Sequence, residues 1–238
     1  MRSPGQARRR NGKALPRGGS ALAAPVAAIC LSLSAGLASC GGVAPEILAL
    51  EWRLELRPAS EGSYESLSVF ASLEDEDGIE DVEELWVVND AEALAWRLDD
   101  GSWTKKTEGT DEWIGAAGLA RQDYAPLPRG DYRLVAIDAA GERIEKPFRI
   151  EGDFPETKAP AVMLEGGGLR AASSWPETLL LAYDGAGELL AAAPSSGAAY
   201  GLAEIFGPEA AARTVEAAAY GYDPTRKMGA YSWKKKTR

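Results

Sequence analysis

Few residue types in this chain of 238 residues could do chemistry. The chain has no histidine, two cysteines, 36 acidic residues and seven tryptophans. Without histidine, a Ser-His-Asp or Cys-His nucleophile, a histidine general base and histidine-bound zinc or iron are all excluded. Carboxylates, lysine and tyrosine are left, and no spacing of carboxylates singles out a pair suited to glycoside hydrolysis. We therefore expect no enzymatic activity and no cofactor.

One acidic loop has the composition of a cation site. Its sequence Asp75-Glu76-Asp77-Gly78, followed by Asp81, alternates oxygen donors before a glycine as calcium loops do. It lacks the third ligand of the Asp-x-Asp-x-Asp-Gly pattern and the distal glutamate. Asp75, Asp77 and Asp81 are therefore weak candidates for metal ligands, and solvated carboxylates are the expected state.

Tryptophan is concentrated in one part of the chain, where four of the seven lie within 28 residues: Trp86, Trp96, Trp103 and Trp113. Trp96 and Trp103 flank Asp99-Asp100-Gly101, where glycine can take a positive φ, so the sequence predicts a β-hairpin. In that hairpin the two indoles would lie near each other across the strands. Such an aromatic pair stabilises a sheet by about 0.2 to 1 kcal/mol, and this structural role is favoured.

The alternative for the same hairpin is ligand binding. Trp96 and Trp103 would form a stacking platform for sugar rings, and Asp99 and Asp100 would accept hydrogen bonds from hydroxyl groups at its rim. This interpretation requires at least one indole face in water.

The N-terminal segment is typical of an export signal. Residues 1–19 are basic without any acidic residue, and Ser20 to Gly36 are mostly apolar but interrupted by Pro25 and serines. Leu37-Ala38-Ser39-Cys40 follows, with an apolar residue three positions before the cysteine and two small residues between them. This motif resembles the lipobox of bacterial lipoproteins, and the resemblance covers about the first 42 residues. The alternative is an uncleaved anchor helix with a coincidental cysteine.

The lipobox resemblance implies cleavage before Cys40 and a diacylglyceryl thioether on its thiol, usually with an N-acyl chain as well. At about 0.8 kcal/mol per buried methylene, two or three chains give effectively permanent anchoring. Gly41, rather than aspartate, follows Cys40 and favours the outer over the inner membrane by analogy with other lipoproteins. We therefore expect a protein of the cell envelope, periplasmic or surface-exposed.

The chain left after cleavage is strongly acidic. Six basic residues and Cys30 leave with the signal, so residues 40–238 carry 20 basic and 36 acidic residues, a net charge of −16. Such a surface repels nucleic acid. No disulfide can form within it, because Cys40 is its only cysteine. The expected partners are the membrane through the lipid on Cys40 and an envelope protein or cell-wall glycan.

Residue patterns predict a mainly β fold. Leu50, Trp52, Leu54 and Leu56 alternate with charged residues, which predicts a strand with one face on a core and one in water. With this strand included, seven or so short strands with turn signals between them lie in about 105 residues, as in an antiparallel sandwich.

The run Leu127-Pro128-Arg129-Gly130-Asp131-Tyr132-Arg133-Leu134, with the later turn Asp138 to Gly141, resembles the last two strands of an immunoglobulin-like or fibronectin type III-like domain. In that resemblance a tyrosine at the corner ties the loop to the strand. The cysteine pair of antibody-type domains is absent, so only the broader sandwich architecture is indicated.

Composition also predicts the boundaries of the parts. Prolines and charges without periodicity at 152–160 indicate a linker, and Pro208 to Arg213 reads as a short helix. The predicted parts are a signal peptide at 1–39, a lipidated spacer at 40–45, an immunoglobulin-like sandwich at 46–151, the linker, a smaller β-rich domain with one helix at 161–233, and a basic tail at 234–238. The expected function is that of a lipid-anchored, non-enzymatic binding or structural module; the alternative is a glycan-binding or polysaccharide-active protein.

Overall fold

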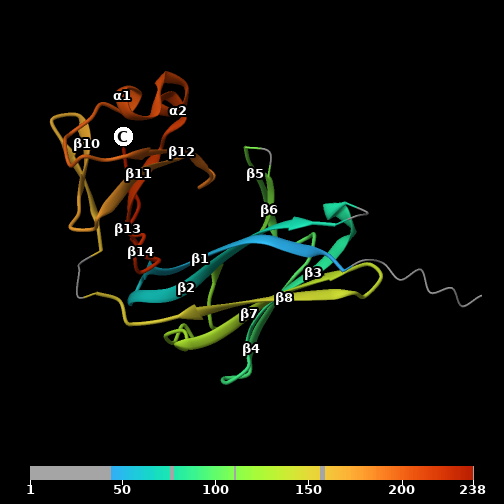
Figure 1. Ribbon diagram of the computed structural model, residues 1–238. Coiled ribbons are helices and arrows are strands. Elements are labelled where there is room, and N and C mark those ends of the chain that lie inside the picture. The colour runs from blue at the N-terminus through green and yellow to red at the C-terminus, as the bar shows by residue number, and fades with distance from the viewer. Residues whose placement is uncertain (1–43, 76–77, 110, 156–158, 238) are drawn as a thin grey trace, which may run out of the picture. The chain divides into compact units, whose positions relative to one another are not determined.

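The computed structural model describes residues 44–75, 78–109, 111–155 and 159–237 (Figure 1). The signal segment, Cys40 and Asp77 lie outside these ranges. The first part of the described chain forms β1 (Glu46–Ala59), β2 (Gly62–Glu74), β3 (Val82–Asn89), β4 (Leu94–Leu98), β5 (Thr104–Glu108), β6 (Asp111–Leu119), β7 (Gly130–Asp138) and β8 (Arg143–Ile150). The second part forms β9 (Ala161–Glu165), β10 (Gly168–Ala172), β11 (Glu177–Tyr183), β12 (Leu189–Pro194), α1 (Leu202–Phe206), α2 (Pro208–Arg213), β13 (Glu216–Asp223), β14 (Met228–Tyr231) and β15 (Lys235–Lys236).

The fold is mainly β, as predicted. A nine-stranded sheet has the order β12-β11-β13-β14-β1-β2-β6-β5, with β15 paired to β13, and a four-stranded sheet has the order β4-β3-β7-β8. The hairpin β9–β10 stands by itself. Pairing is antiparallel throughout the described strands except between β1 and β14, which are parallel. The predicted helix at 208–213 is α2, and α1 precedes it. In the described part of the chain, neither helix is long and apolar enough to cross a membrane.

The main hydrophobic core lies between the two large sheets. Leu54 of β1 and Leu67 of β2 are fully buried in it, and Leu85 and Leu134 meet them from the four-stranded sheet. The period of two along β1 explains this, because alternate side chains of a strand point to the same face. Met228 of β14 belongs to the same core.

A second core covers the C-terminal half of the nine-stranded sheet. Leu180 of β11 and Ala219 of β13 pack there against Val162 and Leu169 of the β9–β10 hairpin. Ile205 of α1 is packed at its edge. This face of the sheet is therefore covered along both halves, by different elements.

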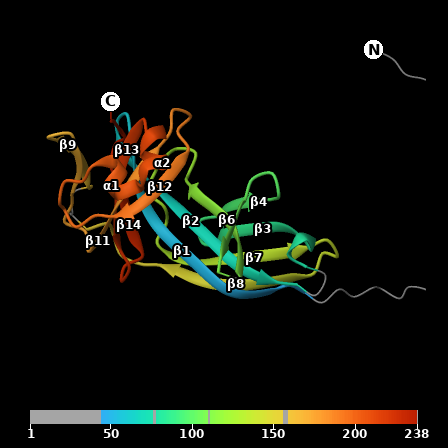
Figure 2. The same ribbon diagram turned by 90° about the horizontal axis from the view of Figure 1, so that it is seen from above.

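The nine-stranded sheet contains strands from both sides of the predicted linker. β1, before the linker, pairs with β14, after it, with Leu54 opposite Met228 (Figure 2). Residues 41–238 form one compact unit of contacts. The division into a sandwich at 46–151 and a smaller domain at 161–233 stays a prediction. The basic block at the C-terminus includes a short strand, because Lys235 and Lys236 pair with β13.

The hairpin predicted around Asp99-Asp100-Gly101 is wrong. β4, which precedes this turn, pairs with β3 of the four-stranded sheet, whereas β5, which follows it, pairs with β6 of the nine-stranded sheet. The turn itself is closed by the backbone N–H of Ser102, which donates to the carbonyl oxygen of Asp99. The chain therefore turns where predicted but passes from one sheet to the other, since each strand finds its hydrogen-bond partner elsewhere.

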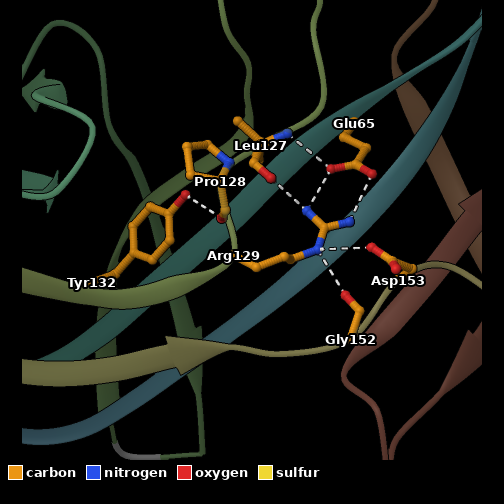
Figure 3. A network of polar contacts seen from close by, with 7 residues as sticks. All are labelled: Glu65, Leu127, Pro128, Arg129, Tyr132, Gly152 and Asp153. Carbon is orange, nitrogen blue, oxygen red and sulfur yellow. Dashed lines mark hydrogen bonds and ion pairs between the residues drawn. The ribbon is translucent and has the colours of Figure 1, made fainter.

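A polar network fixes the corner before β7 (Figure 3). The Tyr132 hydroxyl donates to the Pro128 carbonyl oxygen at 2.8 Å, which is the bond from tyrosine to loop that the sequence predicted. Arg129 forms two parallel hydrogen bonds to Glu65 of β2, of 2.7 and 2.8 Å, and its Nε donates to the Gly152 carbonyl oxygen at 2.7 Å. One side chain thus joins the corner, the nine-stranded sheet and the segment after β8.

Candidate functional site

The face of the nine-stranded sheet opposite the cores carries a dense set of polar and aromatic side chains. We call it the polar face. On β1 it presents Glu51, Arg53, Glu55 and Arg57, which alternate with the core residues. The pairing register brings the following residues of the neighbouring strands to the same face: Ser66, Ser68 and Phe70 of β2, Tyr231 of β14, and Tyr220 and Tyr222 of β13.

Glu55 lies at the centre of this face and is only 3% exposed. Its carboxylate accepts hydrogen bonds from the Arg57 guanidinium at 2.7 Å, the Ser68 hydroxyl at 2.8 Å and the Tyr231 hydroxyl at 3.2 Å. The Arg57 Nε donates to the Ser66 hydroxyl at 2.8 Å. The sequence predicted a water-facing side for β1. For Glu55 this is wrong, because side chains from β2 and β14 close over it.

Cations stack on the aromatic rings of the polar face. The Arg57 guanidinium lies 4.7 Å from the centre of the Tyr231 ring, and that of Arg53 lies 4.9 Å from the Tyr222 ring. Lys106 of β5 lies 4.8 Å from the Phe70 ring. In a similar way, the Lys234 ammonium lies 3.7 Å from the Tyr183 ring. Each such contact fixes a cation and a ring relative to each other.

Tyr220 forms the floor of this aromatic group. Its ring lies 4.5 Å from that of Tyr231 and 6.1 Å from that of Tyr222. Burial raises the pKa of both Tyr220 and Tyr231 well above the usual range of a phenol. A Cβ on Gly229 would lie 2.3 Å from the Tyr220 hydroxyl oxygen, so only glycine at this position lets the phenol lie across β14.

Two hollows open on the polar face and share Tyr231. The first has a volume of about 200 Å³ and is lined by Glu51, Trp52, Arg53, Glu55, Ser68, Phe70, Lys106, Ala117 and Tyr231. The second has a volume of about 440 Å³ and is lined by Arg57, Pro58, Tyr64, Tyr183, Glu216, Ala218, Tyr231, Ser232, Trp233 and Lys234. Concave surfaces with aromatic walls and a few fixed polar groups are typical of ligand sites. The arrangement can hold a ligand. The Glu55 carboxylate already accepts hydrogen bonds from three protein donors.

The acidic candidates are partly brought together elsewhere. Carboxylate oxygens of Asp75, Asp81 and Asp138 lie within 4.8 Å of one another, whereas Asp77 lies outside the described residues. Asp138 is buried, and its carboxylate accepts a hydrogen bond from the Glu142 backbone N–H at 2.8 Å, closing the turn after β7. Oxygen donors at this spacing are what calcium and magnesium use. The sequence missed Asp138 because it lies about 60 residues from the acidic loop.

The tryptophan candidates lie apart from the polar hollows. Trp96 and Trp103 pack, partly buried, against the main core. The Trp96 indole N–H donates to the Ala120 carbonyl oxygen at 3.1 Å. Asp99 accepts a hydrogen bond from the Ser102 hydroxyl at 2.9 Å within its own turn, and Asp100 is exposed. Trp96 and Trp103 therefore form no cross-strand pair, and their binding role stays a prediction.

Sequence reasoning also missed the polar face. Two features of the sequence could have indicated it: the charged residues that alternate along β1 and the tyrosines of β13 and β14. Their meeting depends on the parallel pairing of β1 with β14, which joins residues from opposite ends of the chain.

Comparison with known proteins gives only weak structural similarities. No protein-family model and no curated protein matches the chain. Dimeric latent PorU from Porphyromonas gingivalis is similar with a TM-score of 0.34 and 15% identity, covering 83% of this chain and 20% of PorU. Tp47, the 47-kilodalton lipoprotein of Treponema pallidum, is similar with a TM-score of 0.37 and 12% identity, covering 74% of this chain and 47% of Tp47. The chain thus spans about a fifth of PorU and less than half of Tp47.

Proposed function

We propose that this chain is a lipid-anchored protein of the bacterial envelope that binds its ligand or partner without transforming it. The observation that carries the proposal is Leu37-Ala38-Ser39-Cys40, placed after a basic and then an apolar segment. Cleavage before Cys40 and lipid on its thiol hold residues 41–238 at a membrane surface. Gly41 favours the outer membrane.

The polar face supports binding as the role of the anchored part. Its two hollows bring together fixed rings and fixed charges, and the Glu55 carboxylate is committed to Arg57, Ser68 and Tyr231. A carboxylate held by three donors is poorly placed to act as a general base, which must accept a proton from a substrate. With no histidine in the chain, this favours binding over catalysis.

Lipid attachment is tested by labelling cells with palmitate. The full-length protein should incorporate the label and partition into the membrane fraction, whereas Cys40→Ser should take up no label and appear as an uncleaved or a soluble form. Cys30→Ser is the matched control, because it removes the other cysteine of the chain and should still be labelled. Label on Cys40→Ser, with cleavage at the same position, would show that the lipobox interpretation is wrong.

Binding without catalysis is tested on envelope material. The lipidated protein should retain a partner from solubilised envelope fractions, and incubation with cell-wall and other polysaccharides should release no fragments. Release of sugar fragments would favour the alternative, a polysaccharide-active protein.

A further inference from the structure

We infer that the two hollows of the polar face form one groove, continuous across Tyr231, that binds an uncharged glycan chain. The inference deepens the proposed binding function and rests on it. Both hollows include Tyr231 among their lining residues, so a chain-like ligand can lie in both at once.

The exposed ring of Trp233 in the second hollow suits a sugar ring. Trp233 is 57% exposed and the half-buried Tyr64 lines the same hollow, whereas Lys234 already covers a face of Tyr183. Tyr64 also meets the ring of Tyr124, itself 62% exposed, at 4.8 Å. An exposed apolar patch rimmed by polar residues is typical of an interaction site or a ligand-binding groove. Tyrosine and tryptophan combine a flat apolar body with a polar tip, which matches the C–H faces and hydroxyl groups of a sugar.

The charges of the groove favour an uncharged ligand. Acidic and basic side chains nearly balance there, although residues 40–238 as a whole carry a net charge of −16. Glu55 and Arg57 neutralise each other at 2.7 Å. A cationic ligand would compete with Arg53, Arg57 and Lys234 for ring faces they already cover. An anionic ligand would meet carboxylates in both hollows. Hydroxyl groups can accept from the cations and donate to the carboxylates at once.

Beneath the aromatic rings of the polar face lies a buried hydroxyl that lines neither hollow. Tyr220 is 4% exposed, and its buried hydroxyl has no hydrogen-bond partner among the described residues. It lies over Gly229, which pairs with Glu55 in the sheet.

The test uses the full-length chain purified in neutral detergent. It is applied to an array of uncharged oligosaccharides of glucose, N-acetylglucosamine, galactose and mannose, with heparin as a polyanionic sugar, and hits are titrated by tryptophan fluorescence. Saturable binding to at least one uncharged oligosaccharide is expected. Trp233→Ala and Tyr64→Ala should each weaken it about tenfold, with an unchanged melting temperature. Leu164→Ala, an exposed apolar side chain on β9 away from the groove, is the control and should bind as the wild type.

Three results would overturn the inference. Binding to heparin alone would mean an anion site, and binding lost in Trp103→Ala but kept in Trp233→Ala would place the ligand elsewhere. A lack of binding to every oligosaccharide of the array would show that a glycan is not the ligand. None of these affects palmitate labelling on Cys40, so failure of the ligand class and failure of the lipid-anchored function can be told apart.

Discussion

At the scale of single residues, two side chains fix the corner before β7: Arg129, in the loop, and Tyr132, within β7. Arg129 donates two hydrogen bonds to the Glu65 carboxylate, and the Tyr132 hydroxyl donates one to the Pro128 carbonyl oxygen. Both act across the boundary between a loop and a sheet, where backbone groups lack ladder partners. A planar guanidinium suits this task, because it binds a carboxylate with two bonds and has donors left for carbonyl oxygens.

Arg129→Lys should therefore destabilise the protein although the charge is kept. An ammonium cannot reproduce the paired bonds to Glu65 together with those to the Leu127 and Gly152 carbonyl oxygens, and we expect a loss of about 1 to 3 kcal/mol in the free energy of unfolding. Urea denaturation measures it. The matched control is Arg149→Lys, whose ion pairs with Asp131 and Glu151 are exposed and should change little. Equal effects of the two substitutions would contradict the bridging role of Arg129.

The raised pKa of Tyr132 makes the stability of the folded protein depend on pH in the alkaline range. Burial raises its pKa to about 12 in the folded protein, whereas an unfolded tyrosine titrates near 10. Below pH 10 both states keep the proton. Between about pH 10 and 12 only the unfolded state loses it, so stability falls across this range.

Urea midpoints from pH 9 to 12 should drop less steeply in Tyr132→Phe than in the wild type. At pH 7 the same substitution should cost about 0.5 to 1.5 kcal/mol for the lost bond to Pro128. Tyr124→Phe, at an exposed ring, is the control. Parallel alkaline curves for wild type and Tyr132→Phe would exclude this tyrosine as the cause.

At the scale of elements, β1 positions both the main core and the polar face. From Leu50 to Arg57 its side chains alternate between the two faces, with Leu54 fully buried on one side and Glu55 held by hydrogen bonds on the other, whereas a register shift between Ile47 and Ala49 leaves Ile47 in the core and Leu48 exposed. The strand is longer than the predicted 50–57, running from Glu46 to Ala59, and it pairs with strands on both edges.

Leu54→Ala should cost about 2 to 5 kcal/mol, because it removes buried methyl groups from between the two sheets. Leu48→Ala on the same strand makes the same chemical change at a side chain that is 48% exposed, and should have a much smaller effect. Thermal unfolding followed by circular dichroism gives both values. Similar losses would mean that the two faces of β1 are assigned wrongly.

The elements also show how far the sequence predicts this fold. Periods of two and turn residues are local, so most strands and the helix at 208–213 were predictable, and the Tyr132 corner was implied by the resemblance to immunoglobulin-like domains. Partner choice is not local. The turn at Asp99-Asp100-Gly101 indicates a reversal equally well for a hairpin and for a crossing between sheets. The same limit hid the groove, since Glu55 and Tyr231 are about 175 residues apart in the chain.

At the scale of the whole molecule, the nine-stranded sheet joins the parts before and after the predicted linker. β14 contributes Met228 and Ala230 to the core that the first eight strands build. Sheets continuous across two segments unfold together when their shared core is lost.

Met228→Ala should therefore lower the melting temperature of the entire described chain in one transition, although the residue lies near the C-terminus. Met228 is 1% exposed, and truncation of such a side chain costs about 2 to 5 kcal/mol. Differential scanning calorimetry should give a single peak for wild type and variant. Two peaks, with only one shifted by the substitution, would support two separately folding domains.

The parallel pairing of β1 with β14 leaves β1 without one of its partner strands during synthesis. A ribosome makes β1 first, and its partner about 170 residues later, which at 5 to 20 residues per second is roughly 10 to 35 s. During that interval one edge of β1 has no native neighbour and is open to pairing with other chains. A protein built in this way gains from being kept unfolded until its last strands are available, and delivery across a membrane as an extended chain would meet that need.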